Sequence, residues 1–308
     1  MKQLDEFRIY YNHTIHPELM RMERKRLRLL RLFVFSAILV SAVLILGLII
    51  DILVVTLFLL IPIGFYMAYL LYRLRQFILT FKPNVINLIL DFVDDSINYG
   101  SLKYTAKKKI PKEIFFKSKI FKTDAPYYAG EDFIKGKIGS LDFELCELEV
   151  KEFSPVRNRL NYVFKGVFLA AKFNAPIKGK VVVWPKKFRQ YLTRSIKAFT
   201  WERGFDASYE ILNKKFAKQF MVYATPHTHV VRLVTEDMQK AILKYQKKIG
   251  KEIYFSILNQ EIFIAITEPK DILEPHIFQS NLSFELVREF FEDIYMILNI
   301  LEIFDRSH

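Results

Sequence analysis

The longest run of apolar positions lies near the start of the chain, between residues 32 and 72. The only charged residue in this run is Asp51. A bilayer core about 30 Å thick needs roughly 20 helical residues, so the run predicts two transmembrane helices joined by a tight turn at Asp51. At such a turn the carboxylate reaches water or head groups, which avoids a cost of about 2.5–3.5 kcal/mol at a helix centre.

Two other structures fit the same run of residues. One is a buried helical hairpin in a soluble protein, and the other is a single tilted span with a re-entrant piece. The first is disfavoured because soluble helices of this length normally show a polar face, and this run shows almost none. Within the hairpin, Gly47 is expected to loosen the end of the first span, and Pro62 and Gly64 to kink the second.

The residues on either side of the hairpin show helical periodicity. Upstream, apolar residues recur every three or four positions, and Pro17 predicts that a new helix begins near His16. Downstream, Pro83 is expected to open another helix that ends before Gly100. We expect these flanking helices to form an antiparallel stalk.

Charge next to the apolar run predicts its orientation. Basic residues flank both ends, and the turn has neither Lys nor Arg. The positive-inside rule therefore predicts a multi-pass membrane protein with both termini in the cytoplasm and the turn outside. The basic residues are Arg21, Arg24, Lys25, Arg26, Arg28 and Arg31 before the run, and Arg73, Arg75 and Lys82 after it.

After Gly100 the pattern changes to short runs rich in β-branched and aromatic residues. These runs predict strands, and two longer periodic segments predict helices at 228–249 and 283–304. Asn259-Gln260 predicts a hairpin turn between the last two strands. The expected strands are residues 137–151, 161–173, 179–184, 216–224, 252–258 and 261–267.

Strands mixed with few helices predict an α+β fold. The fold class is an amino-terminal helical stalk with a two-helix transmembrane hairpin, followed by a mixed or antiparallel sheet domain with two long helices. The expected parts are a cytoplasmic helical segment (1–31), the hairpin (32–72), a cytoplasmic stalk (73–100) and a cytoplasmic α+β domain (101–308).

Composition narrows the choice of partners. The net charge of +13 favours an anionic partner, either phospholipid head groups or nucleic acid. Nucleic acid is the weaker choice because no helix-turn-helix, ribonucleoprotein or zinc signature occurs. The single cysteine, Cys146, excludes an intramolecular disulfide.

Several stretches, in order, resemble a known family. They include FRIYYNHTIHPELMRMERKR before the apolar run, then YAGEDFIKGKIGSLDFELCELEV, VFKGVFLAAKFNAPIKGKVVVWPKK and KKFAKQFMVYATPHTHVVRLVTEDMQKAILKYQKKIGKEIYFSILNQEIFIAITEP. By these stretches the chain resembles the bacterial family called domain of unknown function 3137 (DUF3137). The resemblance implies a membrane-tethered cytoplasmic module, and it implies no activity, cofactor or site residue.

Two lysine-rich segments with interleaved aromatic residues, 101–125 and 172–197, are the candidate anion-binding surface. Near a bilayer each basic residue contributes about 1 kcal/mol of attraction to anionic lipid. The alternative is a solvated surface that keeps the protein soluble. The candidates are Lys107, Lys108, Lys109, Lys112, Lys178, Lys180, Lys186, Lys187 and Arg189.

The residues that could perform catalysis do not form a familiar constellation. Glu147, His227, His229 and Asp237 are the candidates. The histidine spacing matches no metal motif, and neighbouring glutamates should raise the pKa of the Cys146 thiol and keep it unreactive. We therefore expect no metal and no cofactor.

The first interpretation is a non-enzymatic binding or scaffold module, anchored in the membrane, that contacts anionic inner-leaflet lipids or a protein partner. The alternatives are a membrane-associated enzyme acting on lipid or envelope precursors, and a small channel or transporter subunit. The last would need a homo-oligomer, because two spans alone make no pore.

Overall fold

The computed structural model describes residues 2–94, 99–154, 158–173, 178–269 and 273–307. The chain forms two compact units. A helical unit comprises Met1–Phe92 and Ile272–Phe291, and a sheet unit comprises Val93–Asp271 and Glu292–His308. The boundaries expected from sequence, with one domain over 101–308, stay a prediction.

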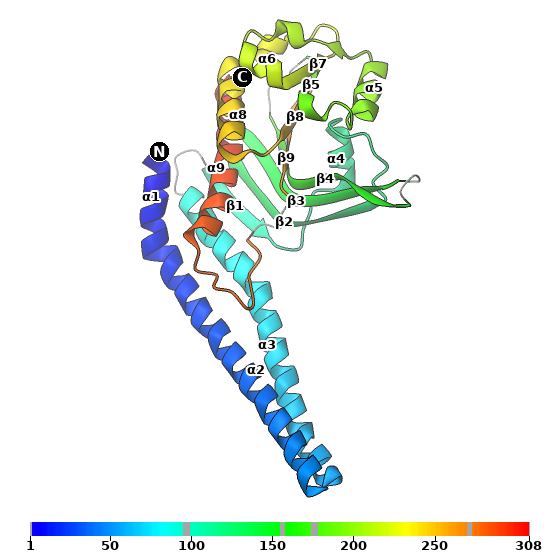
Figure 1. The fold of residues 1–308 in the computed structure, drawn as a ribbon. Coiled ribbons are helices and arrows are strands. Elements are labelled where there is room, and N and C mark those ends of the chain that lie inside the picture. The colour runs from blue at the N-terminus through cyan, green and yellow to red at the C-terminus, as the bar shows by residue number, and fades with distance from the viewer. Residues whose placement is uncertain (1, 95–98, 155–157, 174–177, 270–272, 308) are drawn as a thin grey trace. The chain divides into compact units, whose positions relative to one another are not determined.

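The helical unit is dominated by two long helices that run side by side to a shared turn (Figure 1). Helix α1 (Lys2–Tyr10) passes through a π-helical turn (Tyr11–Ile15) into α2 (His16–Ile50), and α3 (Leu53–Asp94) returns. The new helix predicted near His16 is confirmed, with Pro17 in its first turn. Both long helices are long and apolar enough to cross a membrane.

The turn lies where the sequence predicts it. Asp51 ends α2 in the left-handed conformation (φ 58°), and the Ile52 N–H donates to the Gly47 carbonyl oxygen at 3.2 Å. Gly47 was expected to loosen the end of the first span, but its role in the structure is a different one. A Cβ at this position would lie 2.0 Å from Thr56 Oγ1, so Gly47 lets the two helices approach closely.

The expectation that Pro83 opens a helix is wrong. Helix α3 runs without interruption through Pro62 and Pro83. A proline inside a helix costs about 3 kcal/mol. Apolar residues on both sides of Pro83, including Phe81 and Val85, are buried, and this packing keeps the helix continuous.

Residues 273–291 complete the helical unit. The Phe7 ring stacks on Phe291 with centroids 3.9 Å apart, and the Tyr11 hydroxyl donates to the Leu282 carbonyl oxygen at 3.2 Å. The buried Arg26 guanidinium forms an ion pair with Glu23 at 2.6 Å and donates to the Ile277 carbonyl oxygen. The predicted stalk therefore has a third component that comes from the far end of the sequence.

In the residues that the structure describes, the sheet unit is built on nine antiparallel strands in the order β1-β2-β3-β4-β9-β8-β5-β7-β6. The α+β class is thereby confirmed. The strands are β1 (Tyr99–Thr105), β2 (Tyr127–Ile138), β3 (Leu141–Ser154), β4 (Arg159–Lys172), β5 (Lys180–Pro185), β6 (Phe205–Asp206), β7 (Phe220–Ala224), β8 (Ile253–Leu258) and β9 (Glu261–Thr267).

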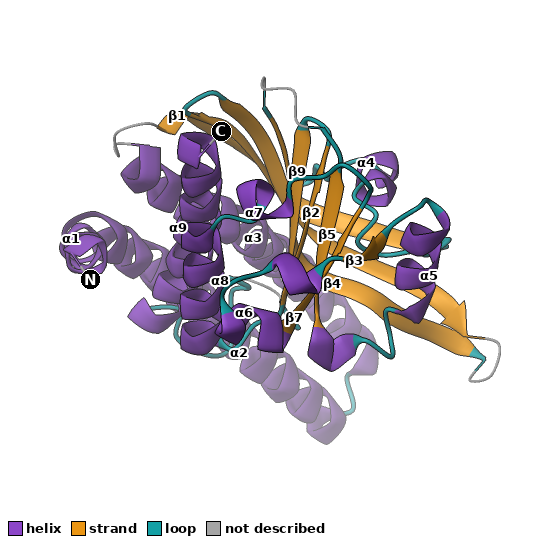
Figure 2. Ribbon diagram, turned by 90° about the horizontal axis from the view of Figure 1, so that it is seen from above, coloured by secondary structure: helices purple, strands orange, loops and turns teal. Residues whose placement is uncertain are grey.

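Helices cover both faces of this sheet (Figure 2). On one face α4 (Lys112–Lys117) and α5 (Thr193–Trp201) enclose a core with Phe115, Phe168 and Trp184 at its centre. On the other face lie α8 (Glu236–Ile249) and the part of α9 (Phe284–Ser307) that belongs to the sheet unit, from Glu292 onward. Shorter helices, α6 (Lys214–Gln219) and α7 (Val230–Leu233), connect the strands.

Several sequence-based boundaries need correction. The expected strand 137–151 is a hairpin corner, because β2 ends at Ile138 and β3 begins at Leu141. The expected strand 216–224 begins as helix α6, and the expected helix 228–249 is divided at Thr235, which caps α8 by accepting from the Met238 N–H. The hairpin turn at Asn259-Gln260 is confirmed, with Asn259 at φ 58°.

Candidate functional site: a basic groove on the sheet

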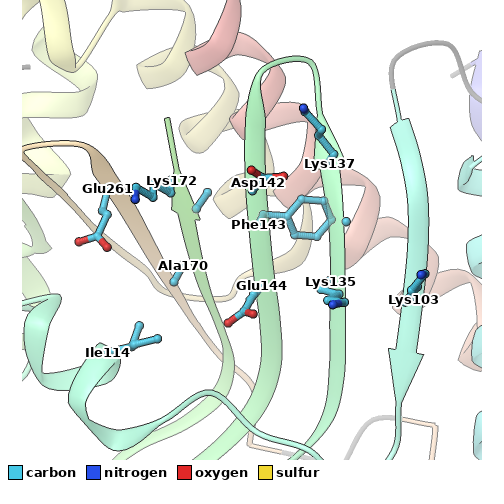
Figure 3. Close-up of a pocket in the computed structure, with 12 residues that line it drawn as sticks. Lys103, Ile114, Lys135, Lys137, Asp142, Phe143, Glu144, Ala170, Lys172 and Glu261 are labelled. Carbon is cyan, nitrogen blue, oxygen red and sulfur yellow. The ribbon is translucent and has the colours of Figure 1, made fainter. Parts of the chain in front are cut away.

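The groove with the clearest charge pattern lies over strands β1 to β4 and β9, next to α4, and is called the sheet groove (Figure 3). Its cavity volume is about 540 Å³. Gly136, Ala170 and Ala171 are among the lining residues, and space remains between the longer side chains around them. The lining residues are Lys103, Ile114, Lys135, Gly136, Lys137, Asp142, Phe143, Glu144, Ala170, Ala171, Lys172 and Glu261.

One row across the sheet groove alternates in charge. Lys137 pairs with Asp142, Asp142 with Lys172, and Lys172 with Glu261 in the strand registers. Directly opposed residues of opposite charge on neighbouring strands stabilise a sheet by roughly 0.2–1 kcal/mol. Glu261 also has an ion pair with Lys117 of α4 at 2.5 Å. This row is an internally balanced ladder of charges.

The next row is not balanced. Lys103 of β1 lies directly opposite Lys135 of β2, and Glu144 of β3 follows. Like charges directly opposite each other destabilise a sheet. Among the described residues, neither ammonium group lies within ion-pair distance of a carboxylate. The Lys103–Lys135 pair is therefore the part of the sheet groove that is best suited to an anion.

Most of the predicted anion-binding lysines have partners within the protein. Lys109 donates to the Tyr128 carbonyl oxygen at 2.8 Å, Lys112 to those of Asp124 and Ala125, and Lys186 to that of Ala217. Lys187 and Lys180 have long ion pairs with Glu252 and Glu202, at 3.7 and 3.8 Å. Lys108 lies 3.8 Å from the centroid of the Phe133 ring.

The remaining predicted residues, Lys107, Lys178 and Arg189, are exposed. None of the predicted nine lines the sheet groove. Lys103 and Lys172 of the groove do belong to the two lysine-rich segments, so the fold brings one end of each segment to the same site. The anion-binding role of the nine residues stays a prediction.

The candidates for catalysis are dispersed. Glu147 is buried in β3, whereas His227 and His229 are exposed in the connection between β7 and α7. Asp237 is exposed in the first turn of α8 near Lys240. In the described ranges, the histidines join no group of three potential metal ligands. Catalysis by these residues stays a prediction without a constellation to support it.

Glu147 instead lies in an acidic cluster. Its carboxylate and those of Glu131 and Asp132 have oxygens within 4.8 Å of one another, a spacing that could hold a metal ion. The cluster forms because Glu131 pairs with Glu147 in register and a bulge at Asp132 (φ 57°) turns a second carboxylate inward. Asp132 accepts a hydrogen bond from the Tyr104 hydroxyl at 2.5 Å. The expectation of no metal stays a prediction.

Cys146 is buried, as the sequence predicts. Burial raises the pKa of its thiol to about 12, although the Ile110 N–H donates to Sγ at 3.3 Å. The nearby carboxylates of Asp132, Glu144 and Glu147 are a smaller part of the cause of this raised pKa. A thiol in this setting is a poor nucleophile at neutral pH.

Sequence reasoning missed five charged groove residues: Lys135, Lys137, Asp142, Glu144 and Glu261. The spacing of the charged residues along the strands could have revealed them. Lys135 and Lys137 are two positions apart in one strand, as are Asp142 and Glu144, so each pair shares a face of the sheet. The expectation of one strand over 137–151 concealed it, because a hairpin turn separates the two pairs.

Comparisons with known proteins match part of the chain to a family model. None of the curated proteins matches it. Among solved structures, it is similar to the crystal structure of the mycobacterial trehalose monomycolate transport factor A, TtfA, with a TM-score of 0.30 and 10% identity. This match covers 63% of the present chain and 88% of that chain, and at such a score it supports no conclusion about fold or function. Residues 162–306 match the family described as "Protein of unknown function (DUF3137)", which confirms the resemblance to DUF3137 over that range.

Proposed function

We propose that this protein is a membrane-anchored binding module, in which the α2–α3 hairpin spans a bilayer and the sheet groove binds an anionic group of a partner. The observation that carries the proposal is the exposure of the hairpin. Only 6% of the most apolar window of the first helix and 11% of that of the second are buried within the protein. Leu48, Ile49 and Phe65 are more than 70% exposed.

In water such a surface would be an aggregation site, because soluble monomers rarely expose a contiguous apolar patch of this extent. In a bilayer the same side chains are solvated by acyl chains. At about 1.5 Å per residue, residues 32–50 span about 28 Å and residues 53–72 about 30 Å. Both lengths match the hydrocarbon thickness of about 30 Å.

The flanking charges support an orientation with both termini in the cytoplasm. Arg28 and Arg31 precede the apolar part of α2, and Arg73 and Arg75 follow that of α3. The turn contains only Asp51 as a charged residue. This distribution favours retention of the charged ends on the cytoplasmic side of a bacterial inner membrane.

The membrane part of the proposal is tested by extraction of membranes with alkaline carbonate. The full chain is expected to stay in the membrane fraction. A variant in which residue 31 is joined to residue 73 is expected to move to the soluble or aggregated fraction. Recovery of the full chain in the carbonate supernatant would contradict the anchor.

The binding part is tested by co-purification in mild detergent. Lys103→Gln/Lys135→Gln removes the like-charged pair, and Lys214→Gln/Lys218→Gln is the matched control on the exposed face of α6. Co-purified acidic proteins and anionic lipids are quantified by mass spectrometry for both variants. Loss of about tenfold is expected only for the groove variant, if each lysine contributes about 0.7 kcal/mol. Equal retention by both variants would refute a role of the sheet groove.

A further inference from the structure

A second cavity lies within the helical unit, between α2 and α3, and is called the interhelical groove. Its volume is about 540 Å³. Residues at helical spacing line it from both sides: Lys25, Arg28 and Leu32 from α2, and Tyr66, Tyr69 and Arg73 from α3. Buried Met22, Leu70 and Phe77 form its base. The groove therefore combines an apolar floor with a cationic rim.

The cations of the rim are not neutralised by the protein. In the ranges that the structure describes, no carboxylate lies within ion-pair distance of Lys25, Arg28 or Arg73. The one acidic residue of the lining, Glu18, has Arg21 as its ion-pair partner at 3.6 Å. The Arg73 guanidinium lies 5.9 Å from the centroid of the Tyr69 ring. Three cations thus line a cavity whose one carboxylate, Glu18, has its ion-pair partner in Arg21.

The interhelical groove lies where the apolar run of the hairpin meets its charged flanks. Leu32 and Tyr66 belong to the apolar run, whereas Arg28 and Arg73 belong to its charged flanks. Tyrosine is enriched at the level of lipid head groups, and basic pockets between transmembrane helices on the cytoplasmic side bind anionic head groups. The position and the charge of the groove fit the same ligand.

We propose that the interhelical groove binds one anionic phospholipid of the cytoplasmic leaflet. The phosphate group lies between Lys25, Arg28 and Arg73, and an acyl chain follows Leu32 and Leu70 toward the bilayer centre. The inference rests on the proposed membrane anchor but is independent of the sheet groove. The apolar floor distinguishes a lipid phosphate from a free phosphate ion, which would gain nothing from it.

The test is native mass spectrometry of the full chain in mild detergent, titrated with phosphatidylglycerol, phosphatidylcholine or inorganic phosphate. The variant is Arg28→Gln/Arg73→Gln. The matched control is Arg24→Gln/Arg75→Gln, which removes two exposed cations from the same helices outside the groove. Phosphatidylglycerol binding is expected to weaken about thirty-fold in the variant, which corresponds to about 1 kcal/mol per cation. Binding by the control is expected to stay unchanged.

Further variants keep the test decisive if the double variant folds poorly. Arg28→Gln and Arg73→Gln alone are expected to weaken binding about fivefold each, and Arg28→Lys/Arg73→Lys to preserve it. Equal losses in variant and control would show general attraction and overturn the site. Displacement of phosphatidylglycerol by an equal concentration of inorganic phosphate would overturn the lipid assignment.

Carbonate extraction of each variant separates the two proposals. If the native chain is extracted, the membrane anchor fails. If the native chain stays in the membrane and the groove variant binds phosphatidylglycerol as tightly as the native chain, only the lipid site fails.

Discussion

Lys251 and Asp293 form a buried ion pair in the sheet unit, with Nζ 2.5 Å from Oδ2. The same ammonium group forms an ion pair with Glu268, which follows strand β9. The Tyr245 hydroxyl of α8 donates to Asp293 Oδ1 at 2.9 Å. Lys251 therefore connects the end of β9 with the last part of α9, and α8 joins the network through Tyr245 and Asp293. All four residues are less than 10% exposed.

Lys251→Met is expected to lower the free energy of unfolding by about 3–5 kcal/mol, because it leaves two buried carboxylates without their cation. The matched control is Lys248→Met, which removes an exposed lysine whose partner is Glu292 at 2.9 Å. The control should cost at most about 1 kcal/mol. Thermal unfolding in mild detergent, followed by circular dichroism, measures both variants. Similar losses would show that burial does not strengthen the Lys251 interactions.

The Lys251 network also predicts a pH dependence. Desolvation lowers the pKa of Lys251, but Asp293 and Glu268 outweigh it and raise this pKa above the ordinary value of 10.5. The folded protein keeps the proton at a pH where the unfolded chain loses it. The stabilisation is therefore complete below about pH 10 and is lost as the pH rises through the raised pKa.

Unfolding measured between pH 9 and 12, as approximate limits around the ordinary lysine pKa, should show this loss in the native sequence. The loss should be smaller in Lys251→Met, because other groups with a raised pKa, such as Tyr128 and Tyr254, still contribute. If the free energy of unfolding depended on pH in the same way in the native protein and in Lys251→Met, the alkaline loss of stability could not be assigned to Lys251.

Cys146 should be inert in the folded protein. Burial and a pKa of about 12 leave little thiolate at pH 8. Treatment with a maleimide is expected to modify Cys146 only after denaturation, at a rate at least about a hundredfold higher than in the native state. Intact-mass measurement over time gives both rates. Rapid modification of the folded chain would show that the core next to α4 opens readily.

Gly47→Leu should separate α2 from α3 near the turn. A Cβ at residue 47 already meets Thr56 Oγ1 at 2.0 Å, and the remaining leucine atoms need still more space. We expect a loss of about 1–3 kcal/mol from overpacking. Gly64→Leu is the control, because a Cβ there meets nothing within 4 Å. Thermal stability in detergent should fall for the first variant alone.

The elements that could be predicted from the sequence are those whose structure is determined by the pattern of their own residues. The hairpin follows from an apolar run with one acid near its centre, and β8 and β9 follow from runs of β-branched and aromatic residues on either side of Asn259-Gln260. The end of helix α8 is marked by Gly250 at φ 73°, whereas its start after Thr235 was not predicted. In each case local propensity and burial favour the same structure.

Other elements depend on distant contacts. Strand β2 has a bulge after Glu131 that interrupts its alternation, and the short α4 lies inside a lysine-rich stretch. The packing of 273–291 in the helical unit rests on pairs such as Phe7 with Phe291. Residues so far apart in sequence carry no shared local pattern, so this contact could not be predicted.

The candidate sites also combine features that are visible in the sequence with features that depend on distant contacts. Lysine-rich segments are visible in the sequence, but which lysines find internal carbonyl oxygens and which border a cavity depends on strand register. Lys103 lies opposite Lys135 only because β1 pairs with β2, and β1 was not expected. The interhelical groove depends on which faces of α2 and α3 meet. The carboxylate cluster at Glu147 requires the bulge at Asp132.

The most direct test of the central claim is cysteine labelling in spheroplasts of a bacterial expression host. In a Cys146→Ala background, Asp51→Cys places a thiol at the turn of the hairpin, and Gln260→Cys places one in the exposed β8–β9 turn. A membrane-impermeant maleimide should label residue 51 in intact spheroplasts and residue 260 only after permeabilisation. Labelling of residue 51 only after permeabilisation would contradict a hairpin that spans the membrane.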